Sequence, residues 1–395
     1  MKQNTIVIAS TDISVGGLGS YIVTLGRCLK MRGWHVHLLT TNEQSTFAEA
    51  LDDDFHYYDI SLVPLSPNKI IHAARLINSV MPDVLLINNC ALVHYALPLL
   101  DSSIKPVSVL HSNDTRFFVH ASIFSKWIFR WVSPAPGLVI PMKSFIPEHQ
   151  HSRIRVIHHG VNKGIYHQDT RRKESGRFQI IFVGFLGASK GAHLLPEIFQ
   201  QVLELVSNSF LTIVGDGPLR TELDASFQRR GIRNRVTMTG MLSREETAEA
   251  LRSSDIFLLP TNLEGFGLAI VEAMMCGVVP VVSLLQGVTD QIVEQARTGF
   301  LVQPTDIRGF VETIAMLGDD DVLRRLLSQA CSQIAREKFG DDRMVAHYIS
   351  VFNEDEDRVA AKTHRFWWFA LVMLQIITKR IHLYRSRHHS GNAID

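Results

Sequence analysis

Residues 5–39 have the sequence TIVIASTDISVGGLGSYIVTLGRCLKMRGWHVHLL, which contains every part of a β-α-β unit. The β-branched run Thr5–Ser10 predicts a buried strand that ends in a glycine-rich turn. Tyr21–Arg32 carries apolar residues at helical spacing, and Gly33 ends this predicted helix. Val36–Leu39 predicts the next strand. The glycine turn therefore lies between a strand end and the N-terminus of a helix.

The same alternation continues along the chain. Further predicted strands are Val84–Ile87, Val107–Leu110, Gln179–Phe182, Leu211–Val214, Val236–Thr239, Ile256–Leu259 and Val278–Val282. Helical patterns follow over Ala192–Leu205, over Leu219–Gln228 and from Gly267 onward. Strands that alternate with helices indicate parallel sheets with helices on both faces. We therefore predict an α/β fold of two doubly wound, Rossmann-like domains, with ligands at the carboxyl ends of the strands.

The predicted domains are residues 1–165 and 178–343. Between them lies the linker 166–177, because Gln168–Arg177 has no apolar side chain and looks exposed. A helical segment, 344–360, follows the second domain, and residues 361–395 form an apolar and basic tail.

The composition indicates a folded globular chain. Of the 395 residues, 46% are hydrophobic and 20% are charged, which is enough to bury a sizeable core. The net charge of +1 argues against a surface built to bind nucleic acid. The four cysteines are far apart, without metal-ligand spacing. The N-terminal residues look like a first strand and not a signal peptide, and no run of 18 apolar residues occurs, so we expect a cytoplasmic protein.

The tail differs from the rest of the chain. Residues 361–395 hold six Lys or Arg and one acid, and Phe366–Leu374 is uninterrupted apolar sequence. A helix over residues 366–377 would be about 18 Å long, too short for the roughly 30 Å of bilayer hydrocarbon. Two interpretations stay open: a final core helix, or a segment that lies on an anionic membrane surface through residues 366–387. We favour the second, because the apolar run adjoins a basic segment.

The most informative segment for chemistry is Thr261–Ala273, TNLEGFGLAIVEA. It contains a loop with two glycines and then the start of a helix. The free N–H groups of residues 266–268 would lie at a positive helix end, which suits a diphosphate. Glu264 and Glu272 would lie on either side, where carboxylates can accept hydrogen bonds from sugar hydroxyls. Their spacing predicts an elongated ligand made of a sugar, a diphosphate and a ribose.

Glu264 and Glu272, with seven residues between them, resemble the paired-glutamate motif of retaining glycosyltransferases with the GT-B fold, specifically family 4 (group 1). Further segments resemble the family's motifs in the same order: Gly16-Gly17-Leu18-Gly19, Val156–Asn162 (the family's I-P-N-G-V-D), Val183-Gly184 with Lys190-Gly191, Gly215–Pro218 and Gly299–Val302. The resemblance covers about residues 5–350. It implies two Rossmann-like domains that face a cleft, and a C-terminal helix within 344–360 that crosses back to the first domain.

The resemblance also implies roles for individual residues. Glu264 would contact the transferred sugar, Lys190 would neutralise the leaving diphosphate, and His111 would lie near the sugar. Glu272 would bind the ribose of the donor. The other implied donor-binding residues are Gly16, Gly17, Gly184, Gly215, Phe266, Gly267 and Leu268. The resemblance implies a front-face displacement with retention, in which the leaving phosphate takes the acceptor's proton, so no covalent nucleophile is needed. No metal or other cofactor is implied.

The resemblance thus predicts a hexosyltransferase that moves a sugar from a nucleotide diphosphate donor to a hydroxyl acceptor. With the tail at the inner face of the cytoplasmic membrane, the expected acceptor is a lipid-linked or envelope glycan in polysaccharide, for example lipopolysaccharide, biosynthesis. Phe185 departs from the family pattern, which has Arg there, so Lys190 alone remains of a two-cation clamp. A catalytically inactive donor-binding subunit of a glycan-assembly complex is therefore the alternative. A remote alternative is a serine hydrolase with Ser189 as nucleophile, because Gly187–Gly191 matches G-x-S-x-G.

Overall fold

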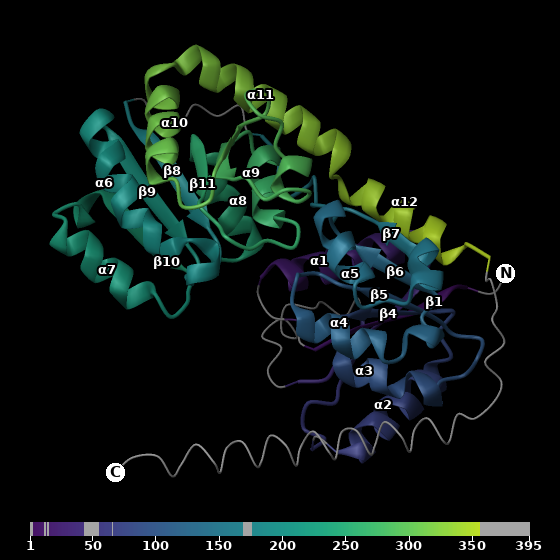
Figure 1. Cartoon of the computed structure of the whole chain (residues 1–395). Coiled ribbons are helices and arrows are strands. Elements are labelled where there is room, and N and C mark those ends of the chain that lie inside the picture. Colours follow the sequence, from purple (N-terminus) through teal and green to yellow (C-terminus); the bar gives the residue numbers. More distant parts are fainter. Residues whose placement is uncertain are drawn as a thin grey trace, which may run out of the picture.

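Strands alternate with helices through the described chain, and they form two separate parallel sheets (Figure 1). The computed structural model describes residues 3–11, 13, 16–42, 55–64, 66–168 and 176–355. Helices pack against both sheets, so the predicted class of two Rossmann-like α/β domains is confirmed.

The first sheet has seven parallel strands in the order β3-β2-β1-β4-β5-β6-β7. These strands are β1 (Thr5–Ser10), β2 (His35–Thr40), β3 (His56–Asp59), β4 (Val84–Asn88), β5 (Lys105–Val109), β6 (Arg130–Ser133) and β7 (Ile154–Val156). The helices of this half are α1 (Gly17–Lys30), α2 (Pro67–Val80), α3 (Ala91–Ala96), α4 (Thr115–Ser122) and α5 (Val139–Lys143). The strand order reverses between β1 and β4, which is where doubly wound sheets bind ligands.

The second sheet has six parallel strands in the order β10-β9-β8-β11-β12-β13. These strands are β8 (Phe178–Val183), β9 (Ser209–Val214), β10 (Val236–Gly240), β11 (Ile256–Leu259), β12 (Val279–Ser283) and β13 (Phe300–Val302). The later helices are α6 (Leu195–Leu205), α7 (Arg220–Arg229), α8 (Arg244–Arg252), α9 (Leu268–Met275), α10 (Ile307–Asp319), α11 (Asp321–Lys338) and α12 (Asp341–Phe352). Here the order reverses between β8 and β11, so their carboxyl ends meet at the centre of the edge.

Alternating side chains of β1 show why the first sheet needs helices on both faces. Val7 and Ala9 pack into one apolar cluster with residues of α2 and α3. Ile6 and Ile8 point to the opposite face and pack with residues of α1. All four are fully buried. A strand that is apolar on both sides is stable only between two helical layers.

The elements lie close to their predicted positions, with a few informative differences. β1 and β11 span the predicted residues. Helix α1 begins four residues before the predicted Tyr21, because Gly16, with φ of 150°, lets the chain enter the helix directly. The glycine turn is therefore the first helical turn. Strands β3, β6, β7 and β13 were not predicted: each has only three or four residues, too few to show a period, and β3 and β6 lack the continuous apolar run of β11.

The last helix, α12, packs on the first domain although it follows the second (Figure 1). Its buried residues Met344, Val345 and Tyr348 belong to the same apolar cluster as Tyr21 of α1. Just before α12, the backbone of Val161 bonds to the chain on either side of Gly340: Val161 N donates to Phe339 O over 2.9 Å, and Asp341 N donates to Val161 O over 3.2 Å. The two crossings between the domains therefore run side by side.

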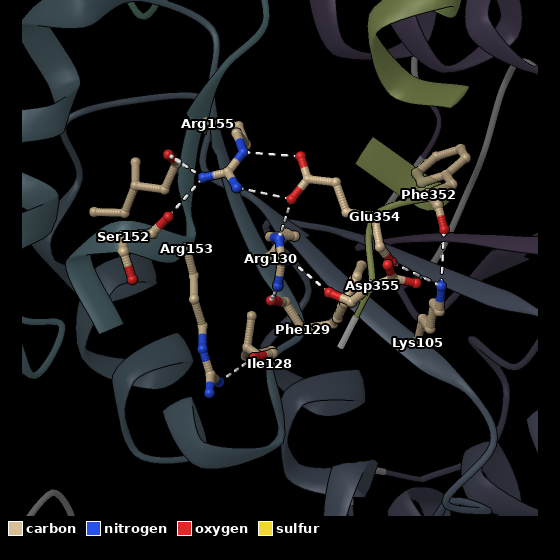
Figure 2. A network of polar contacts seen from close by, with 11 residues as sticks. Lys105, Ile128, Phe129, Arg130, Ser152, Arg153, Arg155, Phe352, Glu354 and Asp355 are labelled. Atoms are coloured by element: carbon tan, nitrogen blue, oxygen red, sulfur yellow. Dashed lines mark hydrogen bonds and ion pairs between the residues drawn. The ribbon is translucent and has the colours of Figure 1, made fainter. Parts of the chain in front are cut away.

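A network of polar contacts holds the end of α12 against the first sheet (Figure 2). Glu354 accepts hydrogen bonds from Arg130 Nε over 2.6 Å and from Arg155 Nη2 over 2.7 Å. Lys105 Nζ donates to the backbone carbonyl of Phe352 over 3.0 Å. The tail of residues 361–395 lies outside the described residues. Among the described residues, no helix is both long enough and apolar enough to cross a membrane.

Candidate functional site

The loops at the carboxyl ends of the two sheets touch each other. A Cβ added to Gly265, in the loop after β11, would lie 1.6 Å from the carbonyl oxygen of His111, which follows β5. A Cβ added to Gly17 would lie 3.6 Å from Cδ1 of Leu268, the first residue of α9. The structure therefore brings predicted site residues from both domains into one interdomain region.

Lys190 and Glu264 form an ion pair, with 2.5 Å between Nζ and Oε1. They are neighbours because Lys190 lies in the turn after β8, Glu264 lies in the loop after β11, and these strands are adjacent in the sheet. The Glu264 side chain is only 9% exposed, whereas that of Lys190 is 27% exposed. The pair thus places a partly accessible ammonium beside a largely buried carboxylate.

The backbone of Ser189 holds the loop that carries Glu264. Its carbonyl oxygen accepts hydrogen bonds from Thr261 Oγ1 over 3.0 Å and from Asn262 N over 2.9 Å. Ser189 belongs to a short turn of 3-10 helix, Ala188–Lys190, and not to a sharp bend directly after a strand. A hydrolase nucleophile needs that sharp bend, so the geometry favours a supporting role for Ser189.

Helix α9 begins directly after a glycine in left-handed conformation. Gly267 has φ of 107° and ψ of 51°, which side-chain-bearing residues rarely adopt. Among the described residues, no side chain caps this helix end, so its first N–H groups can serve a ligand. The Phe266 ring is buried and stacks on His158, with 5.5 Å between ring centroids. Residues 266–268 therefore offer backbone groups, whereas the Phe266 side chain anchors the loop.

The other predicted glycines differ in their surroundings. Gly215 has φ of 133°, and a Cβ there would lie 2.0 Å from the carbonyl oxygen of Gly184, so packing alone requires glycine at this position. A Cβ on Gly184 would meet only the Phe182 ring, at 3.6 Å. A Cβ on Gly16 would have no neighbour within 4 Å among the described residues. As far as these residues go, the backbone of Gly16 and Gly184 is open to close approach of a ligand.

Glu272 lies in the second turn of α9 and lines a small cavity between the domains. Its residue exposure is 9%, and burial raises the pKa of its carboxyl to about 7, although the Arg244 guanidinium and a hydrogen bond from Tyr166 act in the opposite direction. The cavity is lined by Ser20, Thr24, Gly160, Val161, Asn162, Tyr166, Arg244, Leu268 and Glu272. It therefore combines groups from α1, from α8, from α9 and from the crossing segment.

Both ring nitrogens of His111 are bound within the protein. Asn88 donates through Nδ2 to the Ala9 carbonyl, so its Oδ1 is left to accept from His111 Nε2 over 2.9 Å. His111 Nδ1 then accepts from His159 Nε2 over 3.1 Å. Burial lowers the pKa of His111 to about 3, so the ring is neutral at pH 7. Any contact between this ring and a ligand must replace one of these two bonds.

Three residues of this region escaped the sequence analysis. Arg244 follows Ser243 in a capping box, a pattern typical of an exposed helix start. Tyr166 falls within the predicted linker 166–177, yet it is buried. His159 stands where the family motif has Asn, and its ring packs 4.3 Å from that of Tyr21. Of these three residues, only His159 could have been noticed in the sequence, because it departs from the family motif quoted above.

Two further predictions about the site concern the uncharged Phe185 and the need for a metal ion. The Phe185 side chain is 55% exposed, and it supplies no charge beside Lys190. Within the described ranges, no three His, Cys, Asp or Glu side chains converge as metal ligands. That the reaction needs no metal stays a prediction.

Comparison with known proteins agrees with this architecture. Residues 15–164 match the family model "Glycosyltransferase Family 4", and residues 166–338 match "Glycosyl transferases group 1". The chain is 23% identical over 363 residues to N-acetyl-alpha-D-glucosaminyl L-malate synthase of Bacillus anthracis, covering 86% of this chain and 94% of that protein. It is 30% identical over 174 residues to UDP-Gal:alpha-D-GlcNAc-diphosphoundecaprenol alpha-1,3-galactosyltransferase of Escherichia coli, covering 43% and 44%.

Solved structures share the fold at low sequence identity. Sucrose-phosphate synthase of Thermosynechococcus elongatus superimposes with a TM-score of 0.76 at 18% identity, covering 89% of this chain and 98% of that one. TarM of S. aureus, in a complex that includes UDP, gives 0.75 at 12% identity, covering 90% and 100%. HepE of Anabaena, with UDP and glucose, gives 0.74 at 16% identity, covering 88% and 98%. The chain belongs to the group 1, family 4 glycosyltransferases and has their GT-B fold.

Proposed function

We propose that this glycosyltransferase moves a sugar from a nucleoside-diphosphate donor to a hydroxyl acceptor with retention of anomeric configuration. One observation supports the proposal: the Lys190–Glu264 pair and the start of α9 lie in the segments that follow β8 and β11, and Glu272, in the second turn of α9, lines the cavity between the domains. The His111 carbonyl approaches Gly265 of the same loop from the first domain. A sugar, a diphosphate and a ribose bound in that order would meet a matching group at each position.

The proposed step breaks the bond between the anomeric carbon and the donor's phosphate oxygen. The acceptor oxygen bonds to the same face of that carbon, and its proton passes to the departing phosphate. Negative charge thus develops on the phosphate, where Lys190 and the N–H groups of residues 266–268 would stabilise it. Without donor, Glu264 balances the charge of Lys190. With donor bound, the Lys190 ammonium would pair with the diphosphate, and the Glu264 carboxylate would then accept a hydrogen bond from a sugar hydroxyl.

The proposed acceptor is a lipid-linked or envelope glycan, with the enzyme at the inner face of the cytoplasmic membrane. The name of the Escherichia coli relative, which describes a diphosphoundecaprenol-linked sugar, supports this class of acceptor. The apolar and basic sequence of residues 361–395 supports a membrane surface as the place of reaction. Deletion of these residues should release the protein from anionic liposomes, and unchanged sedimentation with the vesicles would contradict the proposal.

A thermal-shift screen with uridine, guanosine and adenosine diphosphate sugars tests the donor. We expect one nucleotide series to raise the melting temperature, and Glu272→Ala to abolish that rise. Release of the nucleoside diphosphate is then measured with and without acceptor. No stabilisation by any of the three series would refute the donor proposal.

A second candidate function is that of a donor-binding subunit without transfer activity, and Phe185 is the residue that favours it. The exposed phenyl ring occupies the position where the family carries Arg, and Lys190 is already paired with Glu264. Donor binding with neither sugar transfer nor slow donor hydrolysis would favour this candidate.

For an active enzyme, Phe185→Arg should raise kcat about tenfold, because a charge-assisted hydrogen bond contributes about 1.5–3 kcal/mol. Met241→Arg is the matched control, since Met241 follows β10 and is similarly exposed, at 51%. An equal gain in both variants would show a general effect of charge and not the restoration of a clamp.

A further inference from the structure

Arg244, the first residue of α8, connects the cavity around Glu272 with the first domain. Its Nη2 donates a hydrogen bond to the backbone carbonyl of Ser20, in α1, over 2.7 Å. Arg244, Glu272 and Ser20 all line the same cavity. Because α8 belongs to the second domain and α1 to the first, this bond spans the cleft. The family motifs quoted above do not include Arg244.

The state of Glu272 depends on its surroundings. A carboxylate accepts hydrogen bonds from hydroxyls most strongly when it is ionised. Burial raises the pKa of Glu272 to about 7, and Arg244 is the first of the groups that lower it. Burial in turn lowers the pKa of Arg244, while Tyr166 and Glu272 raise it. Each charge therefore favours the ionised form of the other residue, whereas burial disfavours the ionised form of both.

The other titratable groups around this pair do not replace Arg244. Tyr166, on the crossing segment, and Cys276, on α9, both have raised pKa values, so they are neutral at pH 7. Arg27, on α1, and Glu245, on α8, act on Arg244 with opposite signs. Within the described part of the chain, Arg244 is thus the cation that acts on the Glu272 carboxyl.

We propose that Arg244 is a positioning residue for the donor, which keeps the Glu272 carboxylate ionised and ready to accept ribose hydroxyls while the Ser20 carbonyl holds it against the first domain. This inference rests on the proposed function, because it takes the ribose of the donor as the ligand of Glu272. The inference adds that the Arg244 side chain both contacts the first domain across the cleft and acts on the donor-binding carboxylate. An open cleft would remove the Ser20 contact and leave Arg244 less constrained.

The test is the pH dependence of UDP binding, measured by calorimetry from pH 5.5 to 9, with GDP and ADP titrated in parallel. For the wild type, affinity should fall about tenfold per unit below a midpoint near pH 7, because Glu272 takes up a proton there. Arg244→Gln should move this midpoint up by about one unit or more, since it removes the balancing charge. Affinity at pH 7 then drops about tenfold and recovers at pH 9.

Three further variants separate charge from fold. Arg244→Lys keeps the charge and should keep the midpoint within about half a unit of wild type. Glu272→Gln should abolish the transition with a midpoint near pH 7, alone and combined with Arg244→Gln, and leave only the titration of the nucleotide's own terminal phosphate, which has a pKa of about 6 and is common to all variants. Arg252→Gln is the matched control: Arg252 lies on the same helix and donates to the Ile165 carbonyl over 3.1 Å, but it is not among the described residues that line the cavity.

The outcomes distinguish this inference from the proposed function. No binding of UDP, GDP or ADP to the wild type would overturn both. Binding with the same midpoint in Arg244→Gln as in the wild type would overturn the role of Arg244 alone. So would an Arg244→Lys variant that behaves like Arg244→Gln. Should Arg244→Gln fail to fold, Arg244→Met, which keeps a long side chain without its charge, takes its place: the same upward shift of the midpoint is expected, and an unshifted midpoint would overturn the role of Arg244.

Discussion

Glu272, the proposed ribose-binding residue, lowers the stability of the fold when it is ionised. Its carboxyl is buried, and its pKa is raised to about 7 from the ordinary value of 4.5. The folded state therefore holds the proton more tightly than the unfolded chain does. Above pH 7 the buried group is ionised, and its desolvation opposes folding.

Glu272→Gln should accordingly stabilise the protein in alkaline solution. From the pKa values of about 7 and 4.5, the gain at pH 8 is at most about 3 kcal/mol, and it should shrink as the pH falls from 7 and vanish near pH 4. Urea denaturation at pH 8 and at pH 5 measures the difference. Nucleotide affinity should fall in the same variant. Equal stability changes at both pH values would show that Glu272 does not titrate as described.

At the scale of elements, the loop after β11 sets how closely the domains approach. A Cβ on Gly265 would lie 1.6 Å from the His111 carbonyl oxygen, far inside van der Waals contact. Gly265 is not one of the glycines with left-handed backbone, so the need for glycine is steric. The contact joins two domains that fold around separate cores.

Gly265→Ala should therefore leave each domain folded and hinder closure. Since a misplacement of 1 Å can cost about 100-fold in rate, we expect kcat to fall roughly 100-fold. The affinity of the second domain for UDP should change much less. Steady-state kinetics and calorimetry on the same preparation give both values, and a wild-type kcat would show that closure tolerates a wider gap.

At the scale of the whole molecule, α12 follows the second domain in the chain and packs on the first, and so connects the two. Its end is fixed by Glu354, which pairs with Arg130 and Arg155 (Figure 2). The Arg130 side chain is only 8% exposed, so Glu354 is a counter-charge for a largely buried guanidinium. The hydrogen bonds from Arg155 first, and then from Arg130, lower the pKa of the Glu354 carboxyl.

Glu354→Gln should destabilise the protein by about 2 kcal/mol at pH 7, because it leaves a largely buried guanidinium without its counter-charge. The folded pKa of Glu354 lies below the ordinary value of 4.5, so the stabilisation is complete above that value and is lost as the pH falls through the folded pKa. The difference between variant and wild type should therefore shrink as the pH falls below 4.5. Denaturation curves at pH 7 and at successively lower pH values measure it.

Glu312→Gln is the control for that prediction. Glu312 pairs with Arg308 on the exposed face of α10, where the two side chains are 60% and 86% exposed. Such a surface pair contributes little, so we expect a change within about 0.5 kcal/mol. Equal losses in both variants would mean that the network at Glu354 contributes no more than a surface ion pair.

The fold could be predicted from local sequence to a large extent. Runs such as Thr5–Ser10 and Ile256–Leu259 are buried on both faces, and each is followed by glycine and a helical pattern, so their structure follows from nearest neighbours in the chain. The start of α9 was likewise predictable, because Gly267 is the residue that its left-handed backbone requires. The short edge strands β7 and β13 were not, since three residues show no period.

The arrangement of the site depended on tertiary structure. The contact of Arg244 with Ser20 joins residues 224 positions apart, and the partner is a backbone carbonyl that every residue has. The pairing of His111 with His159, 48 positions apart, likewise needs the strand end and the crossing segment to meet. Periodicity and composition report which face of an element is buried, but not which distant element covers it. That choice is made only when the two domains and α12 pack together.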